Sequence, residues 1–109
     1  MLYVIIGEDR ADSLSARMDA RPAHLERIQA LVDQGRLIIG GPMPAIDSEN
    51  PGEHGFKGSI IIAEFASLEE AETWAFADPY QLEGIFETLT VRPFKQVLPW
   101  PEGLQLRSL

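Results

Sequence analysis

The stretch Phe56-Lys57-Gly58-Ser59-Ile60-Ile61-Ile62-Ala63-Glu64-Phe65 decides the fold of this chain. Its apolar and β-branched centre is typical of a strand. Successive side chains of a strand point to opposite faces of the sheet, so Ile60 and Ile62 belong to one face and Ile61 and Ala63 to the other. Because both faces are apolar here, we expect both of them to be covered.

Three further segments are short and apolar in the manner of strands: residues 2–6, 36–41 and 86–97. Gly7 bounds the first of these segments. Gly41-Pro42-Met43-Pro44 is expected to end or bend the second, because proline cannot donate a hydrogen bond to a sheet ladder. Pro93 interrupts the last segment, which suits a position at the edge of the sheet or at a bulge.

The first helical region is predicted in two parts. Residues 11–20 are mostly polar and are expected to form one or two helical turns. Pro22 suits the first position of a fresh helix, which then extends through residues 22–34. The apolar residues of this second part fall on one stripe: Leu25, Ile28, Leu31 and Val32. Gly35 is a plausible C-cap.

A second helix is predicted from a capping box. Ser67 is followed three positions later by Glu70, a pairing that satisfies free backbone N–H groups at a helix start. This helix is expected to reach about Ala77, and residues 79–84 are expected to form a separate short turn. Residues 47–55 are rich in polar residues, proline and glycine, which indicates an exposed loop.

The resulting order, β-α-β-β-α-β, predicts an α+β fold of the ferredoxin-like split βαβ type, an antiparallel sheet with two helices on one face. Two helices cover only one face of the sheet. The chain offers no further helix for the second apolar face, so we expect self-association through the sheet, most simply as a two-fold homodimer.

Composition and charge narrow the classes of function that the chain can have. The 109 residues form one domain, predicted as residues 1–97 with a C-terminal tail at residues 98–109 that contains Trp100. A net charge of −8 argues against nucleic-acid or anionic-membrane partners. There is no cysteine, and no apolar run approaches the ~20 residues of a membrane helix. We expect a cytoplasmic location.

The stretch Trp74-Ala75-Phe76-Ala77-Asp78-Pro79-Tyr80 places an acid at a corner. Pro79 disfavours a helical conformation for Asp78, so the chain must turn there. The Asp78 carboxylate is either the N-cap of the turn that begins at Pro79 or half of a proton-transfer site.

His24 is the candidate partner. It lies at the edge of the apolar stripe and is predicted to point toward the sheet from the first turn of its helix. A helix N-terminus disfavours imidazolium and a nearby carboxylate favours it, so such a histidine can act as a general acid or base. The alternative is a half-buried histidine that bonds a backbone carbonyl. Fold topology alone does not guarantee contact between His24 and Asp78.

Three other side chains are candidates for substrate binding: Ser59 by hydrogen bonding, Tyr80 by its phenol, and Arg21 by recognition of an anion. Arg36 is a second candidate for the anion, whereas His54 lies in a polar loop and is expected to be solvated. The sequence contains no phosphate loop, dinucleotide fingerprint or zinc spacing.

Six segments in order resemble the YciI-like (YCII-related) family: residues 1–5, 21–25, 40–45, 55–59, 77–80 and 91–95. The resemblance implies a ferredoxin-like fold that assembles into a dimeric α/β barrel. It also implies a His–Asp pair in a cleft, which falls on His24 and Asp78. Proteins with this fold include a dehydrochlorinase of chlorinated hydroxyhydroquinone and, more distantly, muconolactone isomerase.

The resemblance favours a cofactor-independent lyase or isomerase in which Asp78 orients His24, and His24 moves a proton on a small, cyclic or aromatic-derived substrate. No metal or organic cofactor is implied. Two alternatives come from other classes: a non-catalytic module that binds a small metabolite in the same cleft, and a protein-interaction module that uses the sheet surface.

Overall fold

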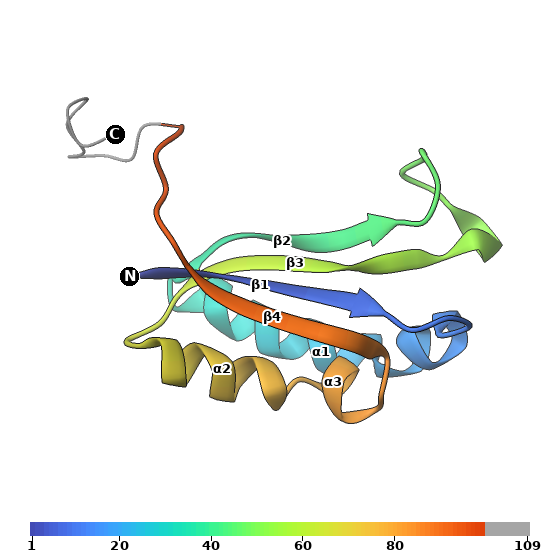
Figure 1. Cartoon of the computed structure of the whole chain (residues 1–109), viewed down its shortest axis with the longest axis horizontal. Coiled ribbons are helices and arrows are strands. Elements are labelled where there is room, and N and C mark those ends of the chain that lie inside the picture. Colours follow the sequence, from blue (N-terminus) through green and yellow to red (C-terminus); the bar gives the residue numbers. More distant parts are fainter. Residues whose placement is uncertain (100–109) are drawn as a thin grey trace.

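The α-helices of residues 1–99 lie on one face of a four-stranded antiparallel sheet (Figure 1). This computed structural model describes residues 1–99. The elements in chain order are β1 (Leu2–Asp9), α1 (Leu14–Asp33), β2 (Leu37–Pro44), the 3-10 turn η1 (Gly52–His54), β3 (Phe56–Glu64), α2 (Leu68–Phe76), α3 (Pro79–Leu82) and β4 (Phe86–Phe94). The strand order is β2-β3-β1-β4. This is the predicted ferredoxin-like α+β arrangement.

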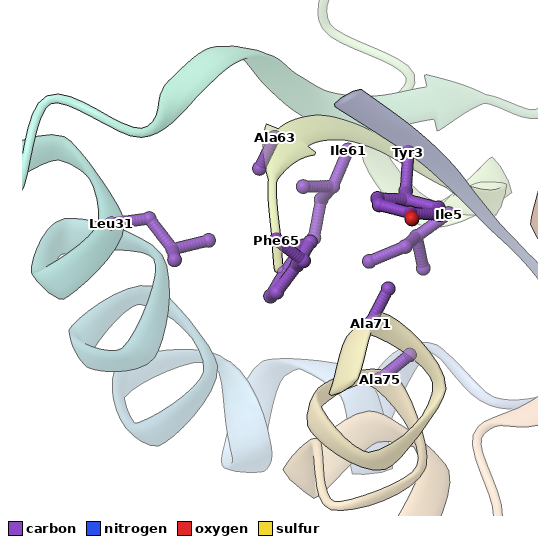
Figure 2. Close-up of a cluster of buried hydrophobic side chains, with 8 residues drawn as sticks. All are labelled: Tyr3, Ile5, Leu31, Ile61, Ala63, Phe65, Ala71 and Ala75. Atoms are coloured by element: carbon purple, nitrogen blue, oxygen red, sulfur yellow. The ribbon is translucent and has the colours of Figure 1, made fainter. Parts of the chain in front are cut away.

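The main core lies between β1, β3 and the two long helices. Ile5 pairs with Ile61 in the central antiparallel ladder, and both side chains are buried on the helix-bearing face. Figure 2 shows these sheet residues facing Leu31 of α1 and Ala71 of α2. The small side chains of α2 allow that helix to pack close to the sheet.

Strand β1 is longer than predicted, because Gly7 does not bound it. The strand continues through Gly7 to Asp9. A Cβ atom on Gly7 would lie 2.4 Å from the ring of Phe86. Glycine is therefore required at this position for the close approach of an aromatic ring rather than for a turn. The extra length carries Asp9 toward the start of α1.

The prediction of two separate helical pieces around Pro22 is wrong. A single helix, α1, runs from Leu14 to Asp33 with Pro22 inside it. Proline costs one backbone hydrogen bond, but buried residues on both sides of it, Arg17 before and His24 after, hold the helix against the sheet. These two residues are seven apart, which places them on one side of the helix.

Strand β2 also continues further than predicted, through Pro42 to Pro44. Pro42 pairs with Ser59 of β3, and β2 is an edge strand, where a missing N–H on the outer side leaves no partner unsatisfied. Pro93 likewise lies in the other edge strand, β4, as predicted. This strand ends at Phe94, earlier than expected.

The predicted cap of α2 is present, because the Ser67 side chain accepts a hydrogen bond from the Glu70 N–H at 3.1 Å. The helix ends at Phe76 with Ala77 as its C-cap. The predicted short turn after Pro79 is the four-residue helix α3.

The other face of the sheet is apolar and no helix of residues 1–99 covers it (Figure 1). Val4 pairs with Ile62, which in turn pairs with Ile39, and Ile39 is 60% exposed. None of the helices in this part of the chain is long and apolar enough to cross a membrane. Trp100 and the rest of the predicted tail beyond Pro99 lie outside the described residues.

Candidate functional site

His24 and Asp78 meet at the corner between α2 and α3. The Nδ1 atom of His24 lies 2.8 Å from Oδ1 and 3.0 Å from Oδ2 of Asp78, and both side chains are almost fully buried. The corner holds the carboxylate over α1 because Asp78 is extended, with φ −67° and ψ 139°, directly before Pro79. Residues 54 positions apart in the sequence thus form a close pair.

The Asp78 carboxylate accepts hydrogen bonds from two further donors. Its Oδ1 accepts the Tyr80 N–H at 2.9 Å, which makes Asp78 the N-cap of α3, and its Oδ2 accepts Arg27 Nη1 at 3.1 Å. Arg27 in turn donates to the Trp74 carbonyl at 2.8 Å. The capping and pairing interpretations of Asp78 are therefore compatible in geometry. Donors from three residues hold the carboxylate in one orientation.

His24 lies in the middle of α1, not in its first turn. The influence of a helix N-terminus fades within that turn, so the predicted dipole effect on His24 does not apply. The carboxylate at Nδ1 favours the tautomer that carries its hydrogen there, which leaves Nε2 as the acceptor of the neutral ring. No residue among 1–99 forms a hydrogen bond with Nε2.

Tyr80 packs face to face on the imidazole of His24. The ring centroids are 3.9 Å apart and the planes are inclined by 10°. The ring of Phe86 packs edge-on against the ring of Tyr80, with centroids 5.7 Å apart. Burial raises the pKa of Tyr80 above its ordinary value of 10.0, against a smaller opposing effect of Arg17. At neutral pH the phenol therefore keeps its proton.

A buried ion pair lies beside this stack. Arg17 Nη1 contacts both carboxylate oxygens of Asp9, at 2.9 and 2.7 Å, and Nη2 donates to the Gly58 carbonyl and to the Ser59 hydroxyl. Its guanidinium carbon lies 4.6 Å from the centre of the Tyr80 ring. Burial raises the pKa of Asp9, and the charge of Arg17 partly offsets that rise.

These groups surround a cavity of about 150 Å³ between α1, β2 and β3. Its lining includes His24, Tyr80, Ser59 and the two arginines Arg17 and Arg21. The backbone of Gly40 and Gly41 and the apolar side chains of Phe56 and Ile61 complete the walls. An apolar cavity of about this volume accommodates a single benzene-sized ring.

The structure brings all five predicted site residues together: His24 and Asp78 in direct contact, and Ser59, Tyr80 and Arg21 with His24 around the cavity. Arg21 is exposed at its rim. Arg36 lies elsewhere, over the ring of Phe65, and His54 is exposed in η1.

Sequence reasoning missed Arg17, Asp9 and Arg27. Arg17, Arg21 and His24 have the spacing of one helix face, and this signal was available, but the predicted break at Pro22 separated Arg17 from His24. Among residues 1–99 no cluster of three or more histidine or acidic side chains is arranged to hold a metal ion.

The described residues form a small ferredoxin-like α+β protein in which a buried His24–Asp78 pair places its imidazole in the wall of a cavity. Residues 1–95 match the family described as YCII-related domain. The chain belongs to this family.

Among known sequences, the chain is 59% identical over 97 residues to Protein YciI of Escherichia coli, an alignment that covers 89% of this chain and 99% of the relative. An uncharacterized protein of Haemophilus influenzae is 45% identical over 97 residues, which cover 89% of this chain and 99% of the relative.

Among solved structures, the chain resembles 5-chloro-2-hydroxyhydroquinone dehydrochlorinase (TftG) of Burkholderia phenoliruptrix AC1100 in complex with 2,5-dihydroxybenzoquinone. The TM-score is 0.77 and the identity is 29%, over 87% of this chain and 94% of the other. The fold class is thus that of the dimeric α/β barrels.

Proposed function

We propose that this protein is a cofactor-independent enzyme of the lyase or isomerase type that uses His24 as a general base and acid. The observation that carries the proposal is the 2.8 Å contact between His24 Nδ1 and Asp78. The His24 ring lines the cavity, and its Nε2 forms no hydrogen bond with any residue of 1–99. Asp78 holds the imidazole in one tautomer and stabilises its cation after proton transfer.

The proposed substrate is a small, planar, oxygen-bearing ring. The cavity has the volume of one ring, and Arg21 at its rim is suited to attract an anionic group. The solved relative named above is a dehydrochlorinase held in complex with a dihydroxybenzoquinone, which supports this class of substrate. Removal of a proton by Nε2 would begin either an elimination or an isomerisation of such a ring.

The direct test is the tautomer of His24, read from the ¹⁵N shifts of its ring nitrogens. The protein contains only two histidines, so the exposed His54 serves as an internal reference in every spectrum. We expect Asp78→Asn to shift the Nδ1–H preference of His24 and to leave His54 unchanged. An identical tautomer balance at His24 in both proteins would refute the pair.

Activity separates the catalytic proposal from a binding module. Chloride release from 5-chloro-2-hydroxyhydroquinone is measured for the protein and for His24→Gln, with His54→Gln as the matched control. Loss of turnover in His24→Gln alone supports catalysis. If His24→Gln retains full turnover, His24 is not the base.

We also propose that the bare sheet face pairs with a second copy of the chain. Val4, Ile62 and Ile39 form a continuous apolar row across this face, and no helix of the described residues covers it. Two such faces are self-complementary under a two-fold axis. The dimer class of the fold supports this arrangement.

A further inference from the structure

Gly40 forms part of the cavity wall without contributing a side chain. It pairs with Ile61 across the β2–β3 ladder, and Ile61 is buried on the helix-bearing face. Directly paired residues of two strands point to the same face of a sheet, so the Cβ position of Gly40 also faces the helices and the cavity. The neighbouring Gly41 pairs with Ile60, and its Cβ position therefore faces the bare sheet face.

The backbone does not require glycine at position 40. Its φ lies outside the left-handed region, unlike those of Gly35 and Gly84. A Cβ atom on Gly40 would meet nothing closer than 3.8 Å, which is an ordinary van der Waals distance to Ile61 and Leu37. A glycine inside a strand weakens that strand, and where neither a turn nor packing calls for it, it marks the close approach of a ligand or of another backbone. The space at this glycine belongs to the cavity, which points to a ligand.

The cavity is apolar around this space. Leu25 and Ile28 of α1 line it together with Gly40. The polar side chain of Ser59 lies further along the ladder, because Ser59 pairs with Pro42, two residues beyond Gly40 in β2. A cavity with a polar end and an apolar end orients an oxygen-bearing ring, so that the edge of the ring without oxygen lies at the apolar end.

We propose that Gly40 determines the specificity of the cavity for an apolar substituent on the substrate ring. This inference deepens the proposed function and rests on it for the presence of a ring. A substituent of the size of a methyl group fills the space that a side chain at position 40 would take. The substrate class is therefore an oxygen-bearing ring that carries a methyl-sized apolar group, preferred over the same ring without that group.

Phenol and the three cresols, which are its methyl derivatives, are the probes. The methyl group is placed at each ring position in turn, and the charge stays the same because all four phenols are neutral at pH 7. Isothermal titration calorimetry measures the four dissociation constants. Burial of one methyl group strengthens binding roughly fourfold, so at least one cresol should bind the parent protein more tightly than phenol by this factor.

Gly40→Ala should abolish the cresol preference and leave the affinity for phenol nearly unchanged. The added methyl group of alanine occupies the space that the cresol methyl group needs. Gly41→Ala is the matched control, because it adds the same group one residue away on the other face of the sheet, where a Cβ atom meets nothing within 4 Å. It should keep the cresol preference.

The stability and mass of Gly40→Ala distinguish a filled cavity from a damaged protein. Alanine is favoured over glycine inside a strand, and its Cβ atom has room here, so the urea midpoint of Gly40→Ala should equal or exceed that of the parent. Light scattering should give the same mass for both proteins. A lower midpoint would assign the glycine to packing, and a changed mass would assign its space to a second copy of the chain. Either result would overturn the proposal.

Absent or equal binding of phenol and all three cresols by the parent protein would also overturn the proposal, as would a cresol preference that survives in Gly40→Ala or is lost in Gly41→Ala. The turnover comparison of His24→Gln with His54→Gln is independent of these affinities. Turnover that depends on His24 in a cavity without size selection would refute this inference alone. Size selection together with turnover that is unchanged in His24→Gln would refute the proposed function alone.

Discussion

At the scale of single residues, Asp78 shows how one side chain serves two structural requirements. Its carboxylate caps α3 through the Tyr80 N–H and orients His24 through Nδ1, while Arg27 binds the remaining oxygen. An acid before a proline is well suited to this, because Pro79 fixes the corner and supplies no N–H of its own. The sequence left capping and proton transfer as alternatives, and the geometry accommodates both.

The substitution Asp78→Asn separates the two tasks. The amide oxygen can still accept the Tyr80 N–H, so the α3 cap should survive, but the negative charge that stabilises imidazolium is lost. We expect turnover to fall roughly 10²–10⁴-fold, the usual contribution of general acid–base catalysis. Steady-state kinetics on the hydroxylated ring substrates measure this.

Asp33→Asn is the matched control, because Asp33 is an exposed acid on α1 that accepts a hydrogen bond from Gln29. It should retain full turnover. Equal turnover in the two variants would contradict a catalytic role for Asp78.

Tyr80 gives a prediction about pH. Its pKa is raised by burial, so above pH 10 the unfolded chain loses this proton before the folded protein does. The contribution of Tyr80 is thus fully present below pH 10 and is lost as the pH rises through the folded pKa. We expect the free energy of unfolding of Tyr80→Phe to fall less steeply from pH 10 upward than that of the parent.

Urea unfolding at a series of alkaline pH values measures this difference. Parallel curves for the two proteins above pH 10 would show that the Tyr80 phenol titrates alike in the folded and unfolded states.

At the scale of elements, the contact between β1 and β3 depends on glycine. A Cβ atom on Gly58 would lie 2.1 Å from the backbone oxygen of Gly7. The Gly58 carbonyl also accepts a hydrogen bond from Arg17, so this close approach of the two strands lies directly beneath the site. Both backbone segments belong to the antiparallel β1–β3 ladder, so neither can move away without breaking its hydrogen bonds.

Gly58→Ala should therefore destabilise the protein by about 3 kcal/mol, at the upper end of overpacking effects. Gly41→Ala is the matched control, because a Cβ atom there meets nothing within 4 Å. We expect it to stay within about 0.5 kcal/mol of the parent. Denaturant unfolding compares the stabilities of the two variants. Equal stabilities would show that the close approach of Gly58 to Gly7 does not require glycine.

The elements also show what the sequence could and could not predict. A run of consecutive apolar and β-branched residues identified β3, and a capping box identified the start of α2, because both signals are local. Pro22 misled the prediction, since tertiary packing on either side of it keeps α1 continuous. The buried pairing of Arg17 with Asp9 escaped notice for the same reason, because it depends on that continuity and on the extra length of β1.

At the scale of the whole molecule, the two faces of the sheet differ. One carries the α-helices of residues 1–99 and the cavity, and the other presents the apolar row Val4, Ile62 and Ile39. The consecutive apolar residues Ile60-Ile61-Ile62-Ala63 predicted this two-sided character. The sequence does not contain a further helix to cover the second face, and we propose a second copy of the chain as its cover.

We expect Ile62→Glu to convert the proposed dimer to a monomer at micromolar concentration, because it places a charge at the centre of an apolar interface. Light scattering measures the mass of each variant. Leu82→Glu, a change at a side chain that is 69% exposed on the helical side, should leave the mass unchanged. A monomeric parent protein under these conditions would contradict the dimer.

Arg27 connects Asp78 to a natural fluorophore, the indole of Trp74. Its guanidinium lies 4.4 Å from the centre of the Trp74 indole and binds Asp78 with the same group. A ligand or proton that disturbs Asp78 must therefore alter the surroundings of a fluorophore. The chain has two tryptophans, so a Trp100→Phe background would let emission from Trp74 report events at the corner without any added label.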